Sequence, residues 1–90
     1  MTAGNYQYIS TATTTVIGAA AYRRISLLGI AINKTLVGTV TIKSGATTIG
    51  VLAIGTLAET YWNVYGGVEI NDLQIVTSAA DDVTVFFTNL

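Results

Sequence analysis

The carboxylates are the side chains of this sequence with the clearest potential for catalysis. Its only acids are Glu59, Glu69, Asp72, Asp81 and Asp82, and it contains no histidine and no cysteine. The common general base, thiol nucleophile and zinc ligands are therefore missing. Two carboxylates can hydrolyse a glycosidic bond, but these acids fall in expected loops or at strand ends, and a chain of 90 residues leaves little room for a cleft. We predict that the protein is not an enzyme and uses no cofactor.

Two acidic clusters raise the alternative of a calcium site. Asn71-Asp72 and Asp81-Asp82 carry the oxygen ligands that Ca²⁺ prefers. However, the clusters flank one expected strand at its opposite ends, which argues against a shared site. Asn and Asp are also typical turn residues, because their side chains hydrogen-bond to nearby backbone. The turn interpretation is favoured, and no metal site is predicted.

An aromatic group, Tyr61, Trp62 and Tyr65, follows the middle of the chain. Exposed together, these rings would form a platform that contacts a glycan or a partner protein. Alternatively, the segment closes one end of the fold with Trp62 inside, because Trp and Tyr bury large areas in small cores. Whether Trp62 is exposed distinguishes the two interpretations.

Charged residues are scarce in this chain. Hydrophobic residues make up 51% of it and charged residues 10%, whereas soluble domains average about 25% charged residues. The length indicates one domain, and a domain this small buries only about 60% of the surface that its unfolded chain exposes. We predict that copies of the protein, or a partner, cover the remaining apolar side chains.

The charge pattern also argues against two classes of partner. The net charge is −1 with four basic residues, too few to follow a nucleic acid backbone. The longest apolar stretch, residues 16–32, is interrupted by Arg23 and Arg24, and residues 49–58 are too few to cross about 30 Å of hydrocarbon. Neither nucleic acid nor membrane is expected as a partner. The first residues lack the features of a secretory signal, so synthesis in the cytoplasm is expected.

Alternation of apolar and polar residues with period two predicts two β-hairpins. Residues 73–77 and 83–88 alternate on either side of a short break of small and acidic residues, which is typical of a hairpin. Residues 36–43 and 46–54 form the other predicted hairpin, around a turn at Ser44-Gly45.

The number and spacing of the strands predict the fold class. Seven or eight short strands with regular turn signals are typical of an all-β, small antiparallel β-sandwich of jelly-roll type. We assign residues 16–90 to this sandwich. Residues 1–15, with Tyr6 and Tyr8 at alternate positions, are expected to form an N-terminal arm or an edge strand.

One predicted strand, residues 22–33, is apolar on both faces. Strict alternation places Ile25 and Leu27 on one face and Leu28, Ile30 and Ile32 on the other. A sandwich core uses only one of these faces. The other face is therefore expected to contact another subunit or a covering loop.

Several segments resemble small β-sandwich virion proteins of tailed bacteriophages. The resemblance is carried by Gly-Gly-Val-Glu-Ile-Asn-Asp-Leu-Gln-Ile at residues 66–75, Asp-Val-Thr-Val-Phe at 82–86, Gly-Thr-Val-Thr-Ile-Lys at 38–43, Ile-Gly-Val-Leu at 49–52 and Leu-Gly-Ile-Ala-Ile-Asn at 28–33. Together these segments span residues 28–86, about two-thirds of the chain. Many members of the group have glycine directly before the leucine of the penultimate strand, where this sequence has Asp72.

The resemblance implies a structural role in a virion. The group includes capsid decoration or cement proteins, which bind the outer capsid surface and stabilise it, and tail or fibre accessory proteins. The first role, with the major capsid protein as partner, is the expected function. The alternative is a tail or fibre module that binds a neighbouring virion protein, or a host glycan through Tyr61, Trp62 and Tyr65.

The resemblance and the excess of apolar residues together predict a closed homo-oligomer. Proteins of this group are commonly trimers, so a trimer is the expected form. The side chains expected at subunit contacts are those left over by the predicted core, namely Leu28, Ile30, Ile32, Val76 and Phe86. A carboxylate in place of Phe86 is expected to dissociate the oligomer, because an unpaired buried charge is very costly.

Overall fold

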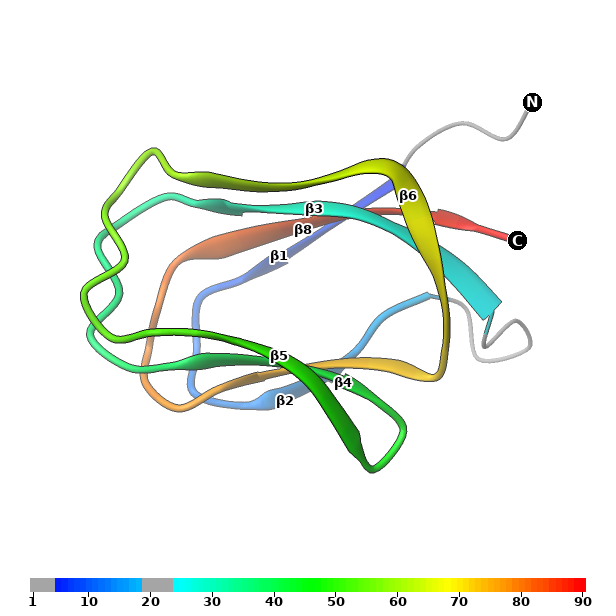
Figure 1. Cartoon of the computed structure of the whole chain (residues 1–90). Helices are drawn as coiled ribbons and strands as arrows, with labels where there is room; N and C mark the ends of the chain where they lie inside the picture. Colours follow the sequence, from blue (N-terminus) through cyan, green and yellow to red (C-terminus); the bar gives the residue numbers. More distant parts are fainter. Residues whose placement is uncertain (1–4, 19–23) are drawn as a thin grey trace.

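The computed structural model describes residues 5–18 and 24–90, which form two packed β-sheets (Figure 1). Sheet A contains β1 (Asn5–Ile9), β8 (Val83–Asn89), β3 (Arg24–Ile32) and β6 (Tyr61–Asn71), in that order. Sheet B contains β2 (Thr14–Val16), β7 (Leu73–Thr77), β4 (Val40–Ser44) and β5 (Thr47–Leu52), in that order. Within these residues there is no helix, and so none that could cross a membrane.

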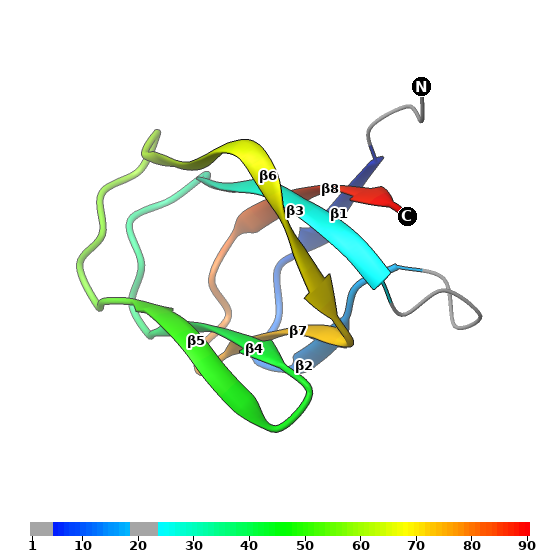
Figure 2. The same ribbon diagram turned by 45° about the vertical axis from the view of Figure 1, so that its right-hand side comes forward.

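The strand order is that of a jelly roll. All neighbouring strands are antiparallel, and the chain changes sheet at every connection except the one between β4 and β5. Figure 2 shows the two layers from a second side, with β7 between β2 and β4. The prediction of a small antiparallel β-sandwich of jelly-roll type is confirmed, with eight strands in the described ranges.

Only one of the two predicted hairpins forms. β4 and β5 pair around a turn at Gly45, whose φ of 57° lies in the left-handed region that glycine tolerates. The other prediction is wrong, because β7 pairs in sheet B and β8 in sheet A. Residues 78–82 therefore cross between the sheets. Alternation is the same for two strands in one sheet and for two strands in facing sheets, so the sequence pattern does not separate these cases.

The core lies between the sheets and is almost entirely aliphatic. Alternate residues of β3, β4, β7 and β8 point inward, as the period of a strand requires. The completely buried side chains are Ile17, Ile25, Leu27, Ile30, Ile32, Leu36, Val40, Ile42, Leu73, Ile75, Val83 and Val85. Apolar burial of this kind is the main force that stabilises the fold.

A β-bulge at Leu28 changes the assignment of faces in β3. Leu27 pairs with Phe87 and Gly29 with Phe86, so two steps on β3 match one step on β8. The extra residue reverses the alternation. Ile30 and Ile32 consequently point into the same core as Leu27, with exposures of 0% and 1%. The expectation that β3 is apolar on both faces is wrong, and so is the placement of these two isoleucines at subunit contacts.

The other neighbour of β3 accommodates the bulge with a larger irregularity. On β6 the pairing moves from Val68 opposite Leu27 to Asn63 opposite Gly29. Between them, Gly66 and Gly67 have φ values of 77° and 75°, a conformation that suits glycine. A Cβ at Gly67 would meet the Oγ of Ser26 and the Cδ2 of Leu28. The glycine pair therefore lets an edge strand kink closely over the bulge.

The chain moves from sheet A to sheet B within a single residue. Asp72 stands between β6 and β7 and has a φ of 54°. Its carbonyl accepts a hydrogen bond from the Gly45 amide at 2.9 Å, and the carbonyl of Asn71 accepts one from the Ser44 hydroxyl at 2.8 Å. The corner is thus held by the turn between β4 and β5. Asp is one of the few non-glycine residues that tolerate this backbone conformation.

Candidate functional site

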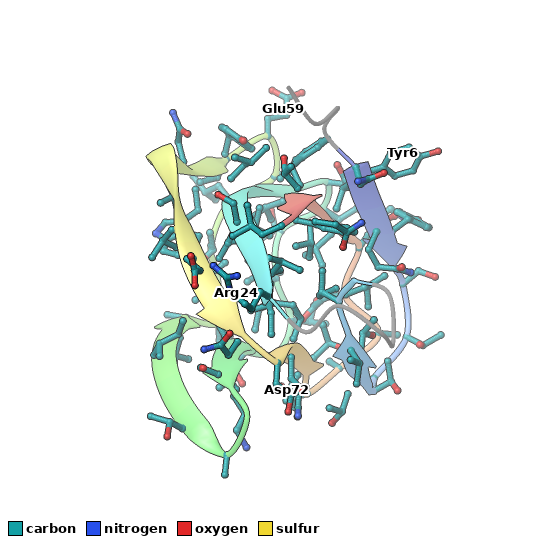
Figure 3. The ribbon with its side chains drawn as sticks, turned by 90° about the vertical axis from the view of Figure 1, so that its right-hand side faces the viewer. Tyr6, Arg24, Glu59 and Asp72 are labelled. Atoms are coloured by element: carbon teal, nitrogen blue, oxygen red, sulfur yellow. The ribbon has the colours of Figure 1, made fainter. Side chains whose placement is uncertain are left out.

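The acids do not converge on one site. In Figure 3, Glu59 and Asp72 lie at opposite ends of the molecule, and Arg24 lies between them. No group of three potential metal ligands occurs within residues 5–18 and 24–90. In the same part of the chain no pocket is found. Glu69, Asp81 and Asp82 instead make separate local contacts.

Glu69 forms an ion pair with Arg24 on the outer side of sheet A. Nε and Nη2 of Arg24 donate to the two carboxylate oxygens at 3.1 and 3.0 Å. The hydrogen bonds and the opposite charge raise the pKa of Arg24 and lower the pKa of Glu69. Both side chains are more than half exposed, so the pair contributes little to stability.

Asp81 is a buried acid that holds a loop. Its side chain is 3% exposed, and its two oxygens accept hydrogen bonds from the amides of Val37 and Gly38 at 2.8 and 3.0 Å. Nearby, the Ser78 hydroxyl accepts a bond from the Thr39 amide at 2.7 Å. The connection between β7 and β8 is therefore fastened to the loop before β4. The role of Asp81 is structural, but it is not the local turn role predicted for the Asp81-Asp82 cluster, because the amides that it binds are 43 and 44 residues away in the sequence.

Asp82 has a second structural role at the end of β3. Nδ2 of Asn33 donates to its Oδ1 at 3.0 Å. A hydrogen bond from the Tyr8 hydroxyl to Asp82 raises the pKa of Tyr8, because ionised Tyr8 could not donate it. This contact ties the edge strand β1 to the neighbouring loop.

The predicted aromatic group does not form a single platform. Trp62 pairs with Ile30 and packs against the core, half-buried. Tyr61, the adjacent residue, points to the other side of β6 and is 47% exposed. The side chain of Tyr65 lies outside the part that the structure describes. Of the two interpretations, the packing of Trp62 against the core agrees with the one that places it inside.

The structure instead brings together four aromatic side chains on the outer face of sheet A, here called the aromatic row: Tyr6, Tyr8, Tyr61 and Phe86. Tyr6 pairs with Phe86 across β1 and β8, and Phe86 pairs with Gly29 of β3. The rings of Phe86 and Tyr61 meet edge to face, with centroids 6.0 Å apart. Figure 3 shows Tyr6 at the outer side of β1. The alternation of Tyr6 and Tyr8 is the signal in the sequence that points to this face.

Gly29 makes room for the aromatic row. An added Cβ would lie 2.5 Å from the Tyr61 hydroxyl oxygen and 2.6 Å from the carbonyl oxygen of Trp62. The Tyr61 ring can therefore lie across β3 toward Phe86 only because this position has no side chain.

Gly29→Ala is therefore expected to lower the free energy of unfolding by about 2 kcal/mol, because backbone and ring must both move. Gly50→Ala is the matched control, since it is also a strand glycine but its nearest contact would be Ile42 Cδ1 at 3.6 Å. Thermal unfolding followed by circular dichroism compares the two. Equal midpoints for both variants would contradict the close packing of Tyr61 over Gly29.

A second exposed apolar surface lies at β5 and its adjoining loops. We call it the apolar patch, and it consists of Val37, Ile49, Val51, Ile54 and Leu57, which are 49–70% exposed. The Leu36 amide donates to the Thr56 carbonyl, and the Gly55 amide donates to the Leu36 carbonyl, both at 2.9 Å. These bonds place the loop that carries Val37 beside the loop that carries Ile54 and Leu57.

The remaining residues expected at subunit contacts fall on two opposite faces. Leu28 and Phe86 are half-buried on the outer side of sheet A. Val76 is half-buried on the outer side of sheet B, where it pairs with Thr14 and Thr41. A single flat interface cannot include both faces. The most exposed aliphatic residues, those of the apolar patch, were not among the predicted contacts.

Comparisons with known proteins add no relative to this picture. No protein-family model matches the chain, and searches of curated proteins and of solved structures give no match. The proposal for its function therefore draws on the chemistry of its surfaces and on the sequence resemblance.

Proposed function

We propose that this protein is a non-enzymatic structural subunit of a virion, which binds the outer capsid surface as a homo-oligomer and stabilises it. The observation that carries the proposal is the apolar patch. Three of the acids support it too, since Glu69, Asp81 and Asp82 all make contacts that serve the fold. The link to tailed phages rests on the sequence resemblance.

The apolar patch has the character of a surface that is covered in the assembled state. Residues 44–58 contain no charged residue, and β5 is an edge strand of sheet B in the part of the chain that the structure describes. Soluble monomers usually protect such an edge with charge, proline or a covering loop. Full burial of one Val, Ile or Leu contributes about 1.5–3 kcal/mol.

Covering the patch would therefore yield about 5 kcal/mol before association costs. A 90-residue domain has a total stability of roughly 5–13 kcal/mol. The free energy gained by covering the patch is comparable with this total stability, so assembly would stabilise the folded subunit substantially.

Oligomerisation is tested by light scattering on the purified protein. We expect a homo-oligomer, with a trimer as the expected form. Val51→Asp is expected to shift it to monomers, because it would bury an unpaired charge. Val16→Asp is the matched control, since Val16 is also an exposed valine on an edge strand of sheet B but lies outside the apolar patch. If the wild-type protein is a monomer at micromolar concentration, the proposed oligomer is wrong. If the two substitutions have equal effects, the apolar patch is not the subunit contact.

The capsid role is tested on particles. Virions that carry the protein are expected to release their genome at a higher temperature than virions stripped of it, and re-addition should restore the difference. The Val51→Asp variant should restore it less well than Val16→Asp. If stripped and decorated particles break at the same temperature, the protein does not act as a cement.

A tail or fibre accessory module that binds a neighbouring virion protein or a host glycan is the second candidate. The aromatic row favours it, because exposed tyrosines are typical of recognition surfaces. Electron microscopy of intact particles with labelled protein separates head from tail.

A further inference from the structure

We propose that the aromatic row is a binding site for a neutral saccharide chain, whose sugar rings lie on Tyr6, Phe86 and Tyr61. The proposal deepens the second candidate function by naming the ligand class and the residues, and it rests on that candidate only for its biological setting. The site is separate from the apolar patch, since it lies on sheet A and the patch lies at β5 of sheet B.

The row has the shape of a shallow, elongated platform. It crosses sheet A from the edge strand β1, through β8 and β3, to the edge strand β6. With strands about 4.8 Å apart, this distance is about 14 Å. The ring of Tyr61 lies across Gly29 of β3 toward Phe86, so the aromatic surface continues from β6 to β8. A flat, extended ligand can therefore reach several rings at once.

The rings are available and partly fixed. Tyr6 is 71% exposed, Tyr8 51% and Tyr61 47%. Tyr61 is held by its edge-to-face contact with Phe86. Rings that are already ordered lose less conformational entropy when a ligand binds.

The chemistry of the face matches the two sides of a sugar ring. The C–H groups of a sugar carry a small positive charge and fit against the negative face of an aromatic ring. The hydroxyl rim of a sugar needs hydrogen-bonding partners. The tyrosine hydroxyls supply these, together with Thr84 and Thr88, which flank Phe86 on the same side of β8. Apolar surface with a few polar groups is typical of small-ligand sites.

The distribution of charge selects a neutral ligand. The ion pair of Arg24 and Glu69 lies beyond one side of the row, at the level of Ser26. Asp82 lies at the other side, next to Tyr8, and its carboxylate accepts a hydrogen bond from Asn33. The positions between them carry no charge. Nucleic acids also stack on aromatic rings, but they need cations for their phosphates, and the only cation described at this face is paired with Glu69.

The test uses the full chain in native gels cast with a panel of neutral polysaccharides: dextran, a mixed-linkage β-glucan, galactomannan, xylan and starch. We expect at least one of them to retard the wild-type protein. Tyr6→Ala should weaken that binding about tenfold, whereas Tyr6→Phe, which keeps the ring, should retain most of it. Val16→Ala, on the opposite sheet and outside the apolar patch, is the control and should bind like wild type.

Tyr6 is highly exposed, so its loss should leave the fold intact, which circular dichroism confirms. The fluorescence of Trp62, the only tryptophan, gives a second readout because this residue adjoins Tyr61. If no polysaccharide in the panel retards the protein, or if Tyr6→Ala and Val16→Ala bind alike, the proposal is overturned. It is also overturned if Tyr6→Ala dissociates the oligomer, since the row would then be covered by a second copy. None of these binding results bears on the heat stability of decorated capsids.

Discussion

Leu27→Ala is expected to lower the free energy of unfolding by about 3 kcal/mol, and Ile30→Ala by a similar amount. Both side chains are completely buried between the sheets, so each truncation removes apolar contacts and leaves a cavity. Against a total stability of roughly 5–13 kcal/mol, either change should lower the thermal midpoint by about 15 °C.

The matched control is Leu28→Ala, which should cost only about 1 kcal/mol, because this leucine sits at the bulge and is half-buried on the outer side. Strict alternation would put Leu28 and Ile30 on one face, with similar costs. Thermal unfolding of the three variants at one protein concentration, followed by circular dichroism, separates the two arrangements. Equal losses for Leu28→Ala and Ile30→Ala would disprove the bulge.

The strands and their inward faces could be predicted from the sequence wherever alternation is unbroken. Leu73 and Ile75 in β7, and Val83 and Val85 in β8, are all buried as their pattern indicates. β3 could not be predicted in this way, because a bulge of one residue leaves no mark on composition. Gly29 directly after Leu28 is the only local hint, since glycine inside a strand often accompanies a bulge or a close approach.

The aromatic row was harder to predict from the sequence, because it depends on which strands are neighbours in the sheet. Tyr6 and Phe86 lie at opposite ends of the chain and meet only because β1 pairs with β8. The local cluster Tyr61-Trp62 was misleading, because neighbouring residues of a strand point to opposite faces. One of these rings belongs to the aromatic row and the other packs against the core.

The excess of apolar residues is not located where the sequence indicated, on a second face of the strand at residues 22–33. β3 does not have a spare apolar face, and its isoleucines all serve the chain's own core. The excess apolar surface is instead concentrated on β5 and its adjoining loops, and on the aromatic row. Two surfaces on different sheets allow one subunit to make two unrelated contacts. If the apolar patch contacts another protein subunit, the aromatic row on the other sheet would face away from that contact.

Asp81→Ala is expected to cost about 3 kcal/mol, although it removes an acid from a surface connection. The carboxylate accepts hydrogen bonds from the amides of Val37 and Gly38, and alanine would leave both amides without a partner. An unsatisfied buried amide costs about 1–3 kcal/mol. The loop at Gly38 is packed closely against the connection that carries Asp81, since a Cβ at Gly38 would lie 2.8 Å from the Cβ of Ala79. The loop therefore has little room to move so that the two amides find other partners.

Asp82→Ala is the control for this prediction, because it removes the neighbouring carboxylate, whose contacts with Asn33 and Tyr8 are exposed. It should cost only about 1 kcal/mol, because exposed hydrogen bonds contribute little to stability. Urea unfolding at two protein concentrations separates loss of fold from loss of assembly, since only assembly depends on concentration. The loop that Asp81 fastens carries Val37 of the apolar patch. Asp81→Ala should therefore weaken the oligomer as well as the subunit, whereas Val51→Asp should weaken the oligomer alone. If Asp81→Ala and Asp82→Ala unfold at the same urea concentration, the buried carboxylate does not hold the loop.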